Sequence, residues 1–84
     1  MENIKYNIVT LKNGKSYFVL EEVSDNLDTY NLILNVEDDS EVKIVMQEVI
    51  EGKTVLTEVK DLLNLSYLKS RFKTKVEESR NALR

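Results

Sequence analysis

Four carboxylates gather in the run Glu37-Asp38-Asp39-Ser40-Glu41, and hard cations such as Ca²⁺ prefer oxygen ligands. A calcium-binding loop spaces its ligands as Asp-x-Asp-x-Asp-Gly and ends on a distal Glu, and this run has neither feature. The sequence also contains no cysteine and no histidine, so it offers no thiolate or imidazole ligand. We therefore expect no metal site and interpret the run as a solvated hairpin tip.

Residues for acid-base or nucleophilic catalysis are poorly placed. The carboxylates of Glu21-Glu22 and Glu77-Glu78 are sequence neighbours, whose side chains diverge on a strand or a helix. No Ser lies in a Gly-x-Ser-x-Gly elbow, and two glycines in the whole chain cannot build a phosphate-binding loop. We expect a protein that is not an enzyme, with no catalytic residues and no cofactor.

Nucleic acid is a weaker candidate partner than protein. Tyrosines can stack on bases, but three of the four lie in strand-like apolar runs where packing explains them. Residues 1–65 carry six bases and thirteen acids, a net charge of −7 that repels phosphate. Residues 66–84 carry six bases and two acids, a net charge of +4, without an element for reading bases. This segment also lacks the tryptophan and wide apolar face of membrane-surface helices.

The elements that would position these residues are strands up to Val59. Asn13-Gly14 separates two apolar runs and predicts a hairpin with a type I′ turn. Further turns are predicted at 25–28, 37–40 and 51–52. In residues 30–36 the even positions are apolar and the odd positions mostly polar, which predicts a strand with one buried face. Short connections favour antiparallel neighbours, so we expect a five-stranded meander.

A helix is predicted from Asp61, a plausible N-cap, to the C-terminus. Its apolar stripe is formed by Leu62, Leu65, Leu68, Phe72, Val76 and Leu83. Such a helix would be about 35 Å long, whereas strands of seven residues span only about 23 Å. The sheet therefore cannot cover the last turns. We expect a core that includes Leu32, Leu34, Ile44, Leu65, Leu68 and Phe72.

The stretches "VTLKNGKSYFVLEEV", "YNLILNVEDD", "VKIVMQEV" and "LSYLKSRF" resemble the small uncharacterised β-meander-plus-helix proteins of low-GC Gram-positive bacteria and their phages. Those proteins open on a hairpin of Lys-Asn/Asp-Gly-Lys-x-Tyr type and close with a helix containing Leu and Phe. The resemblance implies a bacterial or phage origin and assigns no activity. The basic extension past Phe72 departs from that pattern.

Together these features predict an α+β protein of one domain, with a meander over 1–60 and a helix over 61–84 whose last part projects. We expect a protein-binding or assembly module, self-association included, that docks through Lys73, Lys75, Val76, Arg80 and Leu83. Two alternatives remain: a nucleic-acid-binding regulator that uses the basic helix, and a phage-encoded inhibitor that uses the acidic body. Without an apolar span or an export signal, we expect a location in the bacterial or host cytoplasm or in a virion.

Overall fold

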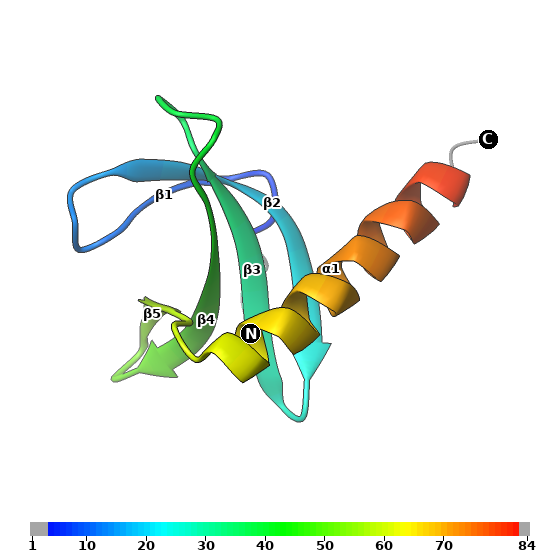
Figure 1. Ribbon diagram of the computed structural model, residues 1–84. Helices are drawn as coiled ribbons and strands as arrows, with labels where there is room; N and C mark the ends of the chain where they lie inside the picture. Colours follow the sequence, from blue (N-terminus) through cyan, green and yellow to red (C-terminus); the bar gives the residue numbers. More distant parts are fainter. Residues whose placement is uncertain (1–3, 83–84) are drawn as a thin grey trace.

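The computed structural model describes residues 4–82, which form an antiparallel sheet followed by one helix (Figure 1). The elements are β1 (Ile8–Thr10), β2 (Ser16–Asp25), β3 (Asp28–Asn35), β4 (Val42–Ile50), β5 (Lys53–Glu58) and α1 (Leu62–Ala82). The five strands lie in chain order and every neighbouring pair is antiparallel. The predicted α+β class, a five-stranded meander with a C-terminal helix, is confirmed.

The turn at Asn13-Gly14 differs from the prediction in its type. At the β1–β2 turn only Gly14 has a positive φ, and its N–H donates to the carbonyl of Leu11. This turn is therefore not type I′, because Gly14 is the fourth residue of a wider loop. Consecutive positive φ angles occur instead at Asn26-Leu27 and at Glu51-Gly52, in the two-residue turns that follow β2 and β4.

The sheet has buried residues on both of its faces. We call the first set the inner cluster, and its members are Ile4, Tyr17, Val19, Ile33 and Val45. Val9 on β1 and Leu56 on β5 both pack against it, so the two edge strands of the sheet curl around the same cluster. The second set, the helix cluster, consists of Val23, Tyr30, Ile44, Leu68 and Phe72.

A bulge in β2 explains how one strand serves both clusters. The register between β2 and β3 shifts between Val19 and Glu21, so Leu20 is the extra residue. Val19 faces the inner cluster, and Val23 faces the helix cluster although both positions are odd-numbered. The predicted single buried face of β3 is wrong, because the edge strands curl around the inner cluster and leave Asn31 and Ile33, on the expected polar face, fully buried.

Most of the predicted core is confirmed. Ile44, Leu68 and Phe72 are buried, and Leu32 and Leu65 pack partly buried against the helix cluster. Leu34 is half-buried and belongs to neither cluster.

The helix begins as predicted, with Asp61 as its N-cap. The Asp61 carboxylate accepts a hydrogen bond from the N–H of Leu63, and its carbonyl accepts one from Leu65. Leu62 is 80% exposed, so its assignment to the buried stripe is wrong. Leu62 is the first residue of α1, and the part of the helix that packs on the sheet begins at Leu65. From there α1 crosses in front of β3 and β2, and its C-terminal end projects beyond the sheet (Figure 1).

Candidate docking surface on α1

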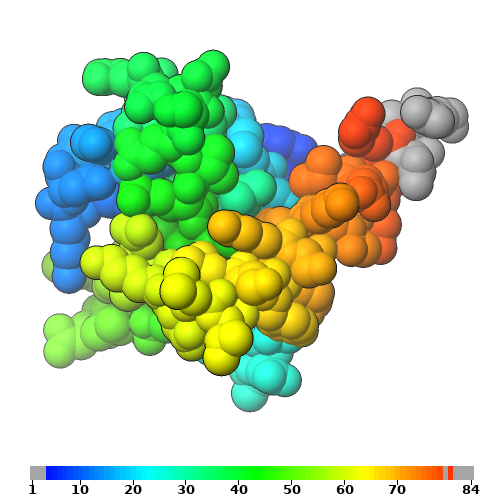
Figure 2. Space-filling model, in the orientation of Figure 1, coloured from blue at the N-terminus to red at the C-terminus, as the bar shows by residue number. Residues whose placement is uncertain are grey.

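The C-terminal part of α1 stands clear of the body (Figure 2). Phe72 is 2% exposed and contacts the helix cluster, whereas Val76, one turn later, is 40% exposed. We call residues 73–82 the overhang. At about 1.5 Å per residue, these ten residues extend roughly 15 Å, or about three strand spacings. The overhang therefore contains an apolar side chain that the sheet does not cover.

The predicted docking residues are divided between two sides of the overhang. Lys73, Val76 and Arg80 are spaced by three and four residues, so they follow one side of the helix, and all three are exposed. Lys75 instead faces β2, where it lines a surface groove. Leu83 lies outside the described residues.

Arg71 fastens α1 to the end of β2. Its Nη1 lies 3.2 Å from Oδ1 of Asp25 and donates to the hydroxyl of Tyr67, while its Nη2 donates to the carbonyl of Ser24. Tyr67 also donates its hydroxyl hydrogen to Asp25. The hydrogen bond to Tyr67 and the charge of Asp25 raise the pKa of Arg71. This cluster holds the helix at the place where the overhang begins.

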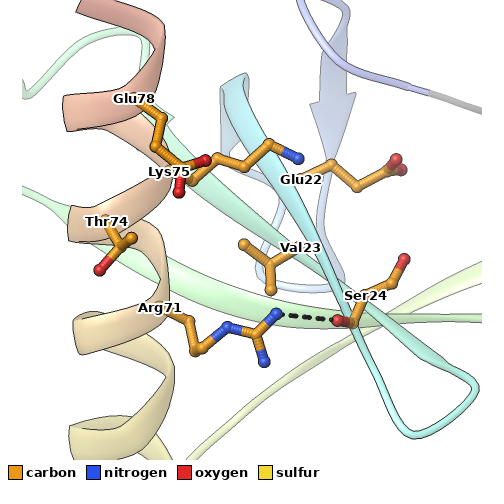
Figure 3. A pocket seen from close by; sticks show the side chains of 7 residues that line it. All are labelled: Glu22, Val23, Ser24, Arg71, Thr74, Lys75 and Glu78. Atoms are coloured by element: carbon orange, nitrogen blue, oxygen red, sulfur yellow. Dashed lines mark hydrogen bonds between the residues drawn. The ribbon is translucent and has the colours of Figure 1, made fainter. Parts of the chain in front are cut away.

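Between the overhang and β2 lies an open groove with a volume of about 320 Å³ (Figure 3). The side chains that line it from α1 belong to Arg71, Thr74, Lys75 and Glu78, and those from β2 belong to Glu22, Val23 and Ser24. The α1 residues follow one another at spacings of three, one and three, as expected for one helix face. Sequence reasoning missed this groove, because no spacing in the sequence indicates that β2 lies beside residues 71–78.

The most concentrated polar network lies elsewhere, around Glu41. Its Oε1 accepts a hydrogen bond from the hydroxyl of Tyr17 at 3.0 Å, and its Oε2 accepts one from the amide of Asn35 at 2.6 Å. Lys15 and Lys43 each lie 3.6 Å from the carboxylate. The hydrogen bonds from Asn35 and Tyr17 lower the pKa of Glu41. The network ties the loop before β4 to Tyr17 on β2 and to Asn35 on β3.

Glu41 should make the protein less stable in acid. Its pKa in the folded protein lies below the ordinary value of 4.5, so its stabilising effect is present above that value and is lost as the pH falls through the lowered pKa. We expect Glu41→Gln to be less stable than the unaltered chain near neutral pH, and the difference to shrink in acid. Urea unfolding at a series of pH values measures both effects.

The control for this experiment is Asp39→Asn, which removes an exposed carboxylate from the same loop. Its pH dependence should stay close to that of the unaltered chain. If Glu41→Gln and the unaltered chain lose stability in parallel from neutral pH to acid, Glu41 does not stabilise the fold through its charge.

The acidic run 37–41, interpreted from the sequence as a solvated hairpin tip, contains hydrogen bonds of its own. Oδ1 of Asp38 accepts both the N–H and the hydroxyl of Ser40. Within residues 4–82, no group of three or more acidic, histidine or cysteine residues is arranged to hold a metal ion. No helix in the same part of the chain is long and apolar enough to cross a membrane.

Comparisons of the chain with family models, with curated proteins and with solved structures find no match.

Proposed function

We propose that this chain is a non-enzymatic protein-binding or assembly module and that it docks through the overhang. The observation that carries the proposal is the loss of cover along α1, from Phe72 in the helix cluster to the exposed Val76. A helix that continues past its own sheet provides a surface for a second molecule. The bases Lys73, Lys75 and Arg80 around Val76 favour a partner with an acidic surface.

A second copy of the chain is one such partner. Residues 1–65 have a net charge of −7, and residues 66–84 have a net charge of +4. Opposite charges on two parts of one molecule favour head-to-tail contact between copies, either as a closed ring or as an open array. The charges would orient the encounter, and burial of Val76 would stabilise the complex.

Deleting residues 74–84 should abolish partner binding or self-association while it changes the melting temperature by only about 2 °C or less. The fold should survive because the buried residues of α1, Leu68 and Phe72, remain. Sedimentation velocity measures self-association, and capture from bacterial lysate measures partner binding. If the truncated chain unfolds, the overhang belongs to the core. If it binds everything that the full chain binds, the proposal is wrong.

Point variants on α1 provide a matched pair for this test. Val76→Asp places a charge on the overhang, and Leu63→Asp places one on an exposed apolar position at the other end of the same helix. We expect Val76→Asp to weaken binding at least about tenfold, because one turn of a docking helix loses its apolar contact. Leu63→Asp should bind like the unaltered chain. Equal effects of the two variants would exclude the overhang as the docking surface.

Nucleic acid is the second candidate partner, favoured by the five bases that α1 carries from Lys69 to Arg80. Binding through phosphate contacts falls steeply with salt because it releases counterions. A gel-shift series with duplex DNA and single-stranded RNA at low ionic strength tests this candidate. The absence of any shift excludes it, and a shift that disappears with added salt supports it.

A further inference from the structure

Within residues 4–82, the second half of β2 has one unpaired edge. β1 pairs only with Ser16–Phe18, and the last main-chain bonds on that side of β2 are those joining Val19 to Tyr6 and Asn7. From Glu21 to Asp25, β2 pairs with β3 on its other side, and no strand in residues 4–82 pairs with it on this side. Such an edge presents main-chain donors and acceptors to an added strand.

Two side-chain hydrogen bonds identify the outward groups. The N–H of Glu22 donates to the carboxylate of Glu21, and the carbonyl of Ser24 accepts from Arg71. In an antiparallel strand, the N–H and the carbonyl of one residue point to the same side, and the side alternates from residue to residue. The carbonyl of Glu22 and the N–H of Ser24 therefore also point outward. These four groups form a main-chain docking edge, which we call the β2 edge.

The overhang lies beside the β2 edge and forms the second wall of the 320 Å³ groove. Figure 3 shows Arg71, Thr74 and Lys75 along the helix, opposite Glu22, Val23 and Ser24 on the strand. An added strand would lie about 4.8 Å from β2, which is within the roughly 15 Å that the overhang extends past Phe72. The overhang extends past the five strands of the sheet, and it is long enough to lie over a sixth strand.

We propose that the groove binds an extended, acidic segment of a partner protein, which adds to the β2 edge as a sixth strand beneath the overhang. This inference rests on the proposed function and names the kind of partner that it requires. Main-chain hydrogen bonds to Glu22 and Ser24 provide affinity, and side chains at alternate positions of the segment contact α1. On the helix wall the two bases Arg71 and Lys75 outnumber the one acid, Glu78, so the side chains that contact α1 are selected as acidic. The other acid of the groove, Glu22, lies on the strand wall.

A second copy of this chain fits the β2 edge less well than a single segment. α1 covers Val23 through Leu68 and Phe72, so a second copy pairing around its own Val23 would bring a second α1 to the same place. The two strands would be about 4.8 Å apart, whereas packed helices need about 8–10 Å between their axes. A lone extended segment brings no helix with it.

The bound segment replaces contacts that the free protein makes for itself. An incoming N–H displaces Arg71 Nη2 from the carbonyl of Ser24, while Nη1 keeps its contact with Asp25. An incoming carbonyl likewise competes with the Glu21 carboxylate for the N–H of Glu22. Glu21 retains its ion pair with Lys5 at 3.0 Å. The free protein thus keeps its edge protected by charged side chains, and binding exchanges two side-chain bonds for main-chain bonds.

The test uses the full chain and a short acetylated peptide of alternating glutamate and valine, with a lysine–valine peptide as its charge control. Amide hydrogen exchange by NMR follows the N–H of Ser24. We expect the acidic peptide to slow this exchange at least about tenfold, because the N–H becomes part of a ladder. The basic peptide should slow the exchange less, since Arg71 and Lys75 outnumber Glu78 on the helix wall.

Proline variants separate the β2 edge from the rest of the fold. Ser24→Pro removes the outward N–H, and Thr54→Pro makes the same change on the free edge of β5, also one residue from a two-residue turn. We expect Ser24→Pro to weaken peptide binding at least about tenfold and Thr54→Pro to leave it unchanged. The exchange measurement on the unaltered chain needs no proline variant, so it decides the question even if Ser24→Pro fails to fold.

Several results would overturn the inference. If the acidic peptide does not slow exchange of the Ser24 N–H, no strand adds at this edge. If both peptides slow it equally, the groove does not select an acidic segment. Self-association that Ser24→Pro abolishes would show that the occupant is a second copy. Partner binding that is lost on deleting residues 74–84 but kept in Ser24→Pro would overturn the sixth strand and leave the proposed function standing. Binding lost in Ser24→Pro but kept after the deletion would overturn docking through the overhang.

Discussion

Replacing Phe72 with Ala should lower the free energy of unfolding by about 3 kcal/mol, measured by urea unfolding near neutral pH. Phe72 is 2% exposed and packs with Val23, Tyr30 and Ile44 of the sheet. The substitution removes the apolar contacts of the ring and leaves a cavity that the neighbouring strands can fill only in part. The large expected loss reflects how few residues of α1 are buried against the sheet.

The matched control is Leu63→Ala on the same helix, where the side chain is 84% exposed. Its loss should stay below about 0.5 kcal/mol, because exposed positions contribute little to packing. If Phe72→Ala also lowers the free energy of unfolding by less than about 0.5 kcal/mol, α1 does not close the core. Both variants introduce Ala into the same helix, so the difference in helix propensity between them is small, about a few tenths of a kcal/mol at most.

Local signals in the sequence were sufficient to predict the elements of this fold. Asp61 was recognised as an N-cap because its side chain has a local role, bonding the N–H of Leu63 two residues away. The turns at 25–28 and 51–52 are predictable because Asn26 and Gly52 tolerate left-handed backbone angles, whereas Leu27 and Glu51, which share such angles, give no signal of this kind. Short connections then favoured a meander over any crossover topology.

The two-sided burial of the sheet could not be predicted from periodicity. Alternation in residues 30–36 indicates two faces but does not show whether the polar face reaches solvent. That face is buried because the edge strands curl around the inner cluster. Val9 and Leu56 both pack against this cluster, and they lie far apart in the chain. The bulge at Leu20 likewise cannot be predicted from the pattern of apolar and polar residues in the sequence.

The candidate site shows the same division between local and long-range information. The excess length of the helix followed from counting residues, and the overhang with its exposed Val76 lies where that excess was expected. The β2 edge did not follow, because it depends on the short length of β1 and on where Arg71 meets Ser24. These residues are 47 positions apart, and no sequence rule brings them together.

The buried polar face of β3 leads to the second large effect that we expect. Asn31 is fully buried, and its amide donates to Oε1 of Gln47 at 2.8 Å. Its own Oδ1 has no hydrogen-bond partner among the described residues. Asn31→Asp keeps the shape of the side chain but replaces the donor with a carboxylate. Near neutral pH we expect this change to cost about 3 kcal/mol, because it buries a charge and opposes the Oε1 of Gln47.

The pH dependence of Asn31→Asp distinguishes a buried charge from a simple packing defect. Burial raises the pKa of the new carboxyl above its unfolded value of about 3.9, so the loss relative to the unaltered chain is greatest near neutral pH. It should shrink as the pH falls toward that value, because the protonated carboxyl can again donate to Gln47. Asn26→Asp, in the exposed turn between β2 and β3, is the control and should change stability by less than about 0.5 kcal/mol. If Asn31→Asp behaves like Asn26→Asp at every pH, water reaches Asn31 and the inner face of the sheet is open in solution.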